Sequence, residues 1–73
     1  MNWPFLRNRD RLRDLQTVRL LGQYTAPEGI LRPGALGTIV YRHPETDAYE
    51  VEFAEPFPTV VTLRAEEIAA TDG

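Results

Sequence analysis

The chain has 73 residues, which is enough for one small domain that buries only about 60% of the surface its unfolded chain exposes. It contains no cysteine, which excludes disulfide bridges, thiolate zinc sites and a cysteine nucleophile. No apolar run approaches the roughly 18 residues of a membrane span, and residues 1–13 lack the apolar stretch of a signal peptide, so we expect a cytoplasmic protein.

The net charge of −3 conceals an uneven distribution of charge along the chain. Residues 1–19 carry five arginines and two aspartates, a local charge of +3. Residues 20–73 carry three arginines and nine acidic residues, a local charge of −6. We therefore predict a basic N-terminal extension over residues 1–13 that is attached to an acidic domain over residues 14–73.

The extension combines aromatic residues with arginines in a weakly amphipathic pattern, and two interpretations stay open. It is either a short extension that caps one end of the domain with an aromatic side chain, or an arm that binds an anionic partner. The contacts of such an arm would be Trp3, Phe5, Arg7, Arg9, Arg11 and Arg13.

Residues 17–21 predict the first strand, with Val18 and Leu20 toward the core. Residues 22–33 contain two prolines and two glycines, which argue against any regular element, so we predict a long loop. Tyr24 lies in this segment. A tyrosine in a long loop either anchors the loop or contacts a partner, and Tyr24 is therefore a candidate binding residue.

The central hairpin gives the clearest pattern. Residues 48–53 alternate, with Tyr49, Val51 and Phe53 on one face and two glutamates, Glu50 and Glu52, on the other. A slip of one residue would bury both glutamates, so the register of this strand is well specified.

Residues 36–42 are rich in β-branched and aromatic residues and predict the preceding strand of the hairpin. Gly37 inside it indicates a bulge, a bend or the close approach of another backbone. Residues 43–47 predict the polar turn between the two strands. We interpret His43 as a solvated turn residue rather than a general base, because a base needs an oriented partner and a pocket.

The C-terminal third completes the domain. Residues 54–58 predict a tight connection that holds Phe57 between two prolines, and residues 59–63 predict another strand. Residues 64–67 predict a single helical or 3₁₀ turn. Residues 68–70 predict a last short strand beside the first one, which would protect the sheet edges.

Five short strands, a long first loop, two hairpins and a one-turn helix are the order of parts in a Src-homology-3-like barrel. Three motifs carry a closer resemblance: Leu-Arg-Pro-Gly-Ala-Leu-Gly-Thr-Ile-Val from residue 31, Ala-Tyr-Glu-Val-Glu-Phe from residue 48, and Val-Val-Thr-Leu from residue 60. Over residues 14–70 the chain resembles a family of small bacterial proteins of unknown function with this barrel. Some members are encoded beside genes that look like toxin genes, so the resemblance implies an antitoxin or immunity role.

We therefore expect an all-β fold, a small five-stranded and partly open Src-homology-3-like barrel with a short N-terminal extension. The sequence contains no catalytic constellation, metal-ligand cluster or phosphate-binding loop. We predict a non-enzymatic interaction module without a cofactor, whose acidic face binds another protein. The predicted contacts are Tyr24, Glu50, Glu52, Glu55 and Phe57.

Two alternatives remain open. The chain could associate with nucleic acid through its arginine-rich arm, although an acidic domain disfavours phosphate contacts. It could also be a small structural subunit of a larger complex. We expect no contact with a membrane in any of these roles.

Overall fold

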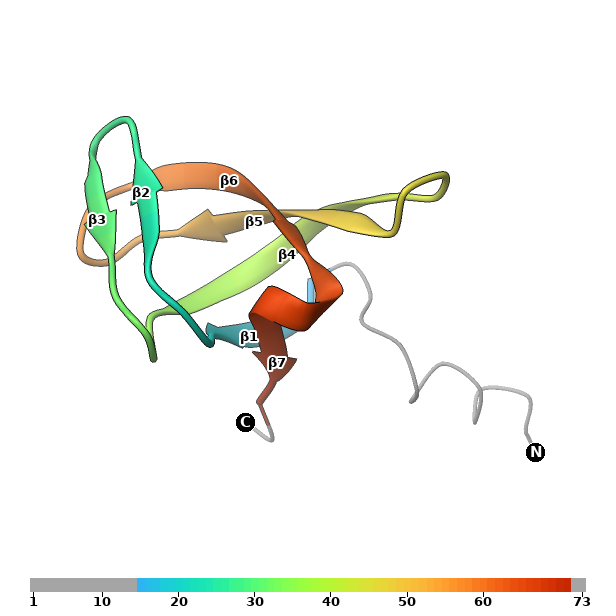
Figure 1. Ribbon diagram of the computed structural model, residues 1–73, viewed down its shortest axis with the longest axis horizontal. Helices are drawn as coiled ribbons and strands as arrows, with labels where there is room; N and C mark the ends of the chain where they lie inside the picture. The colour runs from blue at the N-terminus through green and yellow to red at the C-terminus, as the bar shows by residue number, and fades with distance from the viewer. Residues whose placement is uncertain (1–14, 72–73) are drawn as a thin grey trace.

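The computed structural model describes residues 15–71, and its regular elements are seven strands and one 3₁₀ turn (Figure 1). The described part of the chain is therefore all-β, as predicted. In chain order the elements are β1 (Thr17–Leu20), β2 (Tyr24–Ala26), β3 (Gly29–Leu31), β4 (Leu36–His43), β5 (Ala48–Phe53), β6 (Thr59–Arg64), η2 (Ala65–Glu67) and β7 (Ile68–Ala70).

Five of the strands form one antiparallel sheet in the order β6-β5-β4-β1-β7, while β2 and β3 form a separate two-stranded sheet. The sheet is strongly curved, and the chain passes from β6 through η2 into β7 beside β1 (Figure 1). The predicted pairing of the last strand with the first is confirmed, since Leu20 lies opposite Ile68 and Val18 opposite Ala70. Strands β6 and β7 are the two edge strands of this sheet and do not pair with each other. Strand pairing therefore does not close the sheet into a barrel.

The prediction of an irregular loop over residues 22–33 is wrong, because this segment contains the β2–β3 hairpin. Ala26 lies opposite Gly29, so Pro27 and Glu28 form a two-residue turn. The first proline therefore lies in the turn and the second, Pro33, follows β3. Neither interrupts a strand ladder, which is why the hairpin tolerates them.

The core lies between the inner side of the five-stranded sheet and the β2–β3 hairpin. The predicted alternation in β5 is confirmed, because Tyr49, Val51 and Phe53 are buried whereas Glu52 is exposed. The hairpin adds Leu31, which has no exposed surface. Burial of a side chain of this size stabilises the fold by about 1.5–3 kcal/mol. The largest fully buried side chains are Phe53, Leu20, Leu31, Ile39, Leu63, Val18 and Val51.

Gly37 marks a close approach of another backbone rather than a bulge. A Cβ atom at Gly37 would lie 3.0 Å from the backbone oxygen of Glu52 and 2.7 Å from Cγ1 of Val51. The bulge of β4 lies three residues further on. Pairing with β5 passes from Ile39 directly to Tyr41, which leaves Val40 as the extra residue.

Within residues 15–71 there is no helix with the length and apolarity that crossing a membrane requires.

Candidate functional site

The side of the five-stranded sheet that faces away from the core carries an unusual mixture of side chains, and we call it the outer face. It arises from the alternation of β5 and from the register of β5 with its neighbours. Glu52 lies between Thr38 of β4 and Val60 of β6, and Glu50 lies between Tyr41 and Thr62. The outer face comprises Leu36, Thr38, Val40, Tyr41, His43, Glu50, Glu52, Val60 and Thr62.

Large apolar side chains are exposed on this face. Val60 is 53% exposed, Tyr41 52% and Leu36 57%. The bulge at Val40 contributes directly, because the extra residue shifts the alternation of β4 and leaves Val40 and Tyr41 exposed in succession. A group of exposed apolar residues with polar residues around it is typical of a surface that binds a partner.

Glu50 is held by two donors on the neighbouring strands. Its Oε2 atom lies 2.6 Å from Nε2 of His43 and accepts a 2.8 Å hydrogen bond from the hydroxyl of Thr62. These contacts with His43 and Thr62 hold the pKa of the Glu50 carboxyl below its usual range. The ring of Tyr41 meets the ring of His43 edge-on, with centroids 4.9 Å apart. The contacts of Glu50 therefore link β4, β5 and β6 on the outer face.

The prediction that His43 is a solvated turn residue is only partly correct, since its carbonyl oxygen accepts the turn hydrogen bonds of Thr46 and Asp47 but its ring is held on the sheet. His43 is the last residue of β4, its side chain is 39% exposed, and its ring contacts the Glu50 carboxylate. The four residues that follow it form the turn, so its place in β4 brings its side chain to the outer face. The polar character of residues 43–47 suggested a five-residue turn, whereas the observed turn comprises residues 44–47.

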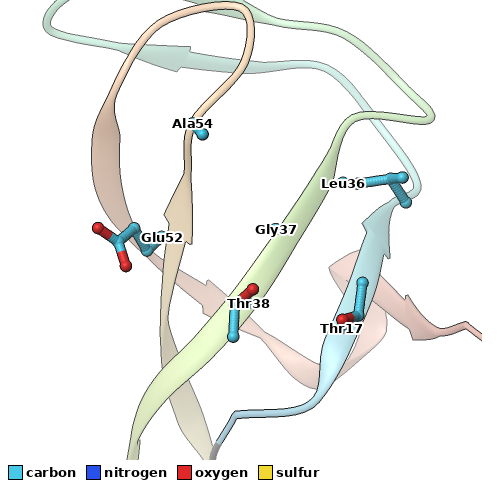
Figure 2. A pocket seen from close by; sticks show the side chains of 6 residues that line it. All are labelled: Thr17, Leu36, Gly37, Thr38, Glu52 and Ala54. Atoms are coloured by element: carbon cyan, nitrogen blue, oxygen red, sulfur yellow. The ribbon is translucent and has the colours of Figure 1, made fainter. Parts of the chain in front are cut away.

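Glu52 is the other carboxylate of the outer face. Among residues 15–71 it makes neither an ion pair nor a side-chain hydrogen bond, unlike Glu50. It borders a shallow hollow of about 320 Å³. Figure 2 shows the side chains around this hollow, which come from β1, β4, β5 and the residue after β5. They belong to Thr17, Leu36, Gly37, Thr38, Glu52 and Ala54.

The other predicted contacts lie elsewhere. Glu55 is exposed in the connection between β5 and β6, beyond the end of the outer face. Tyr24 and Phe57 are half-buried and pack against the core. A Cβ atom at Gly29 would lie 2.9 Å from the ring of Phe57, so this ring closes over the β2–β3 hairpin.

The structure therefore brings together only two of the five predicted contacts, Glu50 and Glu52. Sequence reasoning missed the apolar part of the face, Leu36 and Val60. The alternation in β6 could have revealed Val60, because in Thr-Val-Val-Thr-Leu the two positions that flank the inward Val61 must point outward.

The residues predicted for the arm all lie outside the described residues 15–71. They are Trp3, Phe5, Arg7, Arg9, Arg11 and Arg13. In residues 15–71, no three side chains of the His, Cys, Asp or Glu type are arranged as ligands of a metal ion.

Comparison with known proteins adds one finding. Neither a curated protein nor a solved structure matches the chain. A family model does match, over residues 14–70, which is most of the chain. The chain therefore belongs to the family described as a domain of unknown function, DUF4926.

Proposed function

We propose that the chain is a non-enzymatic interaction module that binds a basic partner protein through its outer face. The observation that carries this proposal is the gathering of exposed apolar side chains around the carboxylate of Glu52, which makes no ion pair within residues 15–71. Such a patch offers apolar area for affinity and a charge for selection, since opposite charges speed encounter and reject wrong partners.

The parts of the face have different roles in this proposal. Tyr41 is the aromatic anchor, because an exposed ring supplies a large contact area at a low cost in conformational entropy. Glu52 receives a lysine or arginine side chain of the partner. Glu50, already held by His43 and Thr62, keeps β4, β5 and β6 in register beneath the contact.

We also propose that the fold is a partly open Src-homology-3-like barrel and that the protein acts in the cytoplasm. The order of parts supports the barrel, with the β2–β3 hairpin in place of the long first loop. The resemblance of residues 14–70 to a family with some members encoded beside genes that look like toxin genes favours an antitoxin or immunity role for this module. That role predicts a partner whose expression alone arrests growth and whose effect is relieved by co-expression of this protein.

The test begins with affinity capture by the tagged full-length protein from its own cell extract, with a nuclease-treated control. We expect a basic protein that remains bound after nuclease treatment. Addition of this partner to ¹⁵N-labelled protein should then shift the backbone amide signals of Thr38, Glu52 and Val60. Shifts confined to the β2–β3 hairpin would contradict the use of the outer face.

A second candidate function, association with nucleic acid, rests on the arginines at the N-terminal side of the domain. Arg19 on β1 is exposed and makes no ion pair among the described residues, so it offers one further positive charge on the domain itself. This function predicts recovery of nucleic acid, a steep fall of affinity with salt, and loss of binding when residues 1–13 are deleted.

A third candidate is a structural role as a small subunit of a larger complex. It predicts that the protein is captured only with the assembled complex and binds none of its components alone.

A further inference from the structure

A second hollow, of about 450 Å³, opens where the β3–β4 connection meets the β5–β6 connection. Its volume falls within the roughly 300–1,000 Å³ of ligand pockets in proteins. It is lined by Ile30, Arg32, Pro33, Ala35, Pro56 and Phe57, none of which borders the hollow beside Glu52.

One wall of this hollow is fixed by contacts between the hairpin and the sheet. The ring of Phe57 lies so close to Gly29 that a Cβ atom there would be 2.9 Å from Cε2 of the ring. Beside it, the buried Thr59 donates a 2.8 Å hydrogen bond to Oε1 of Glu28. Only a glycine at position 29 lets the ring adopt this position without a shift.

The opposite wall is fixed by the backbone. The N–H of Ala35 donates to the carbonyl oxygen of Arg32 at 3.1 Å, and the carbonyl oxygen of Ala35 accepts from the N–H of Leu20 at 2.8 Å. The N–H of Gly34 donates to the carbonyl oxygen of Leu20 at 2.7 Å. The turn that carries Arg32 is therefore held on β1, and both walls are formed before any ligand arrives.

The lining combines five apolar residues with one cation. Arg42 and Arg64 each form an ion pair with a nearby carboxylate, whereas Arg32 forms none among residues 15–71. Two carboxylates lie near the lining in sequence: Glu28, which accepts a hydrogen bond from Thr59 and keeps its negative charge, and Glu55, which precedes Pro56. A guanidinium at the edge of an apolar hollow suits a ligand that presents an apolar group beside a carboxylate, since its fork of N–H donors matches both carboxylate oxygens.

We propose that this hollow binds an acidic peptide segment of a partner protein, with an aromatic or long aliphatic side chain against Phe57 and a neighbouring carboxylate on Arg32. The charge of Arg32 selects the acidic residue, and the prolines and Phe57 receive the apolar side chain. This site is separate from the outer face, and its ligand has the opposite charge to the partner proposed there.

The test uses the ¹⁵N-labelled full-length protein and two small probes, N-acetyl-Trp-Glu amide and its neutral counterpart N-acetyl-Trp-Gln amide. The acidic probe should shift the amide signals of Ile30, Arg32, Ala35 and Phe57. It should bind at least about fivefold more tightly than the neutral probe, because only the acidic probe gains a charge-assisted pair. Added salt should reduce this difference.

Two variants separate the charge from the fold. Arg32 is exposed, so Arg32→Gln should leave the spectrum of the free protein nearly unchanged and remove the preference for the acidic probe. Glu55→Gln should strengthen binding of the acidic probe, since it removes the competing negative charge. Equal binding of the two probes by the wild-type protein, or shifts outside the lining residues, would overturn the proposal.

Discussion

The ring of His43 at the end of β4 meets the carboxylate of Glu50 on β5 at 2.6 Å. This contact joins the two strands on the exposed side of the sheet, while Ile39 of β4 and Val51 of β5 lie opposite each other on the buried side. On the outer face, therefore, the carboxylate of Glu50 is held by neighbouring side chains, whereas that of Glu52 makes no ion pair with any other described residue.

The first prediction concerns the titration of Glu50. Its pKa is lowered in the folded protein by His43 and Thr62, so the folded state favours the ionised carboxylate. The resulting stabilisation is present above the pKa of the unfolded chain and is lost as the pH falls through the lowered folded pKa. Carboxyl ¹³C titration should give a midpoint for Glu50 below its ordinary value, and Thr62→Val should raise it. A wild-type midpoint at or above the ordinary value would refute these contacts.

The second prediction compares two glycines. In Gly37→Ala the new methyl group would lie 2.7 Å from Cγ1 of Val51 and 2.9 Å from Cε2 of Phe53, both in the core. We expect the free energy of unfolding to fall by about 1–3 kcal/mol, the usual cost of overpacking. In Gly22→Ala the new methyl group has no neighbour within 4 Å, so this control should unfold no more easily than the wild type. Urea denaturation of both variants measures the difference.

The third prediction concerns the attachment of the hairpin. Thr59 is 8% exposed and its hydroxyl donates to Glu28 in the β2–β3 turn. Thr59→Val should lower the free energy of unfolding by about 0.5–1.5 kcal/mol, the net value of one hydrogen bond. Hydrogen exchange of the hairpin amides should become faster, because the hairpin opens more often. The matched control is Thr25→Val, an exposed threonine of the same hairpin, and it should leave the exchange unchanged.

The fourth prediction separates the two faces of β6. Leu63 has no exposed surface, so Leu63→Ala should cost about 2–5 kcal/mol through lost burial and a cavity. Val60 is 53% exposed, and Val60→Ser should change stability by no more than about 0.5 kcal/mol. Thermal unfolding checks both variants. A large loss of stability in Val60→Ser would mean that the outer face serves the fold rather than a partner.

These comparisons also show how far the sequence could predict the structure. Both the extent and the buried face of strand β5 were predictable, since its alternation places three large residues inside and the glutamates outside. The β2–β3 hairpin was not, because a count of prolines and glycines cannot show that Pro27 lies in a two-residue turn. The bulge at Val40 could not be predicted, because it lies within an uninterrupted run of β-forming residues. The exposure of Tyr41 depends on this bulge and was therefore missed as well.

Only the charged part of the candidate site was predicted. Glu50 and Glu52 followed from the alternation of β5. The alternation does not show that Glu50 is hydrogen-bonded and Glu52 is not. That difference depends on His43 and Thr62, which lie on the two neighbouring strands. Leu36 joins the face where β4 pairs with β1, a pairing between residues distant along the chain, whereas the outward position of Val60 follows from the alternation of β6. Tyr24 and Phe57, which the sequence suggests as exposed anchors, are half-buried and pack against the core.

The central claim is that the outer face binds a basic partner, and one measurement tests it most directly. The affinity of the captured partner is measured by calorimetry for the wild type, Glu52→Arg and the control Glu45→Arg, which makes the same charge change in the exposed β4–β5 turn. We expect Glu52→Arg to weaken binding at least about tenfold and Glu45→Arg to change it far less, since only Glu52 lies inside the contact. Unchanged affinity in a folded Glu52→Arg variant would contradict the account.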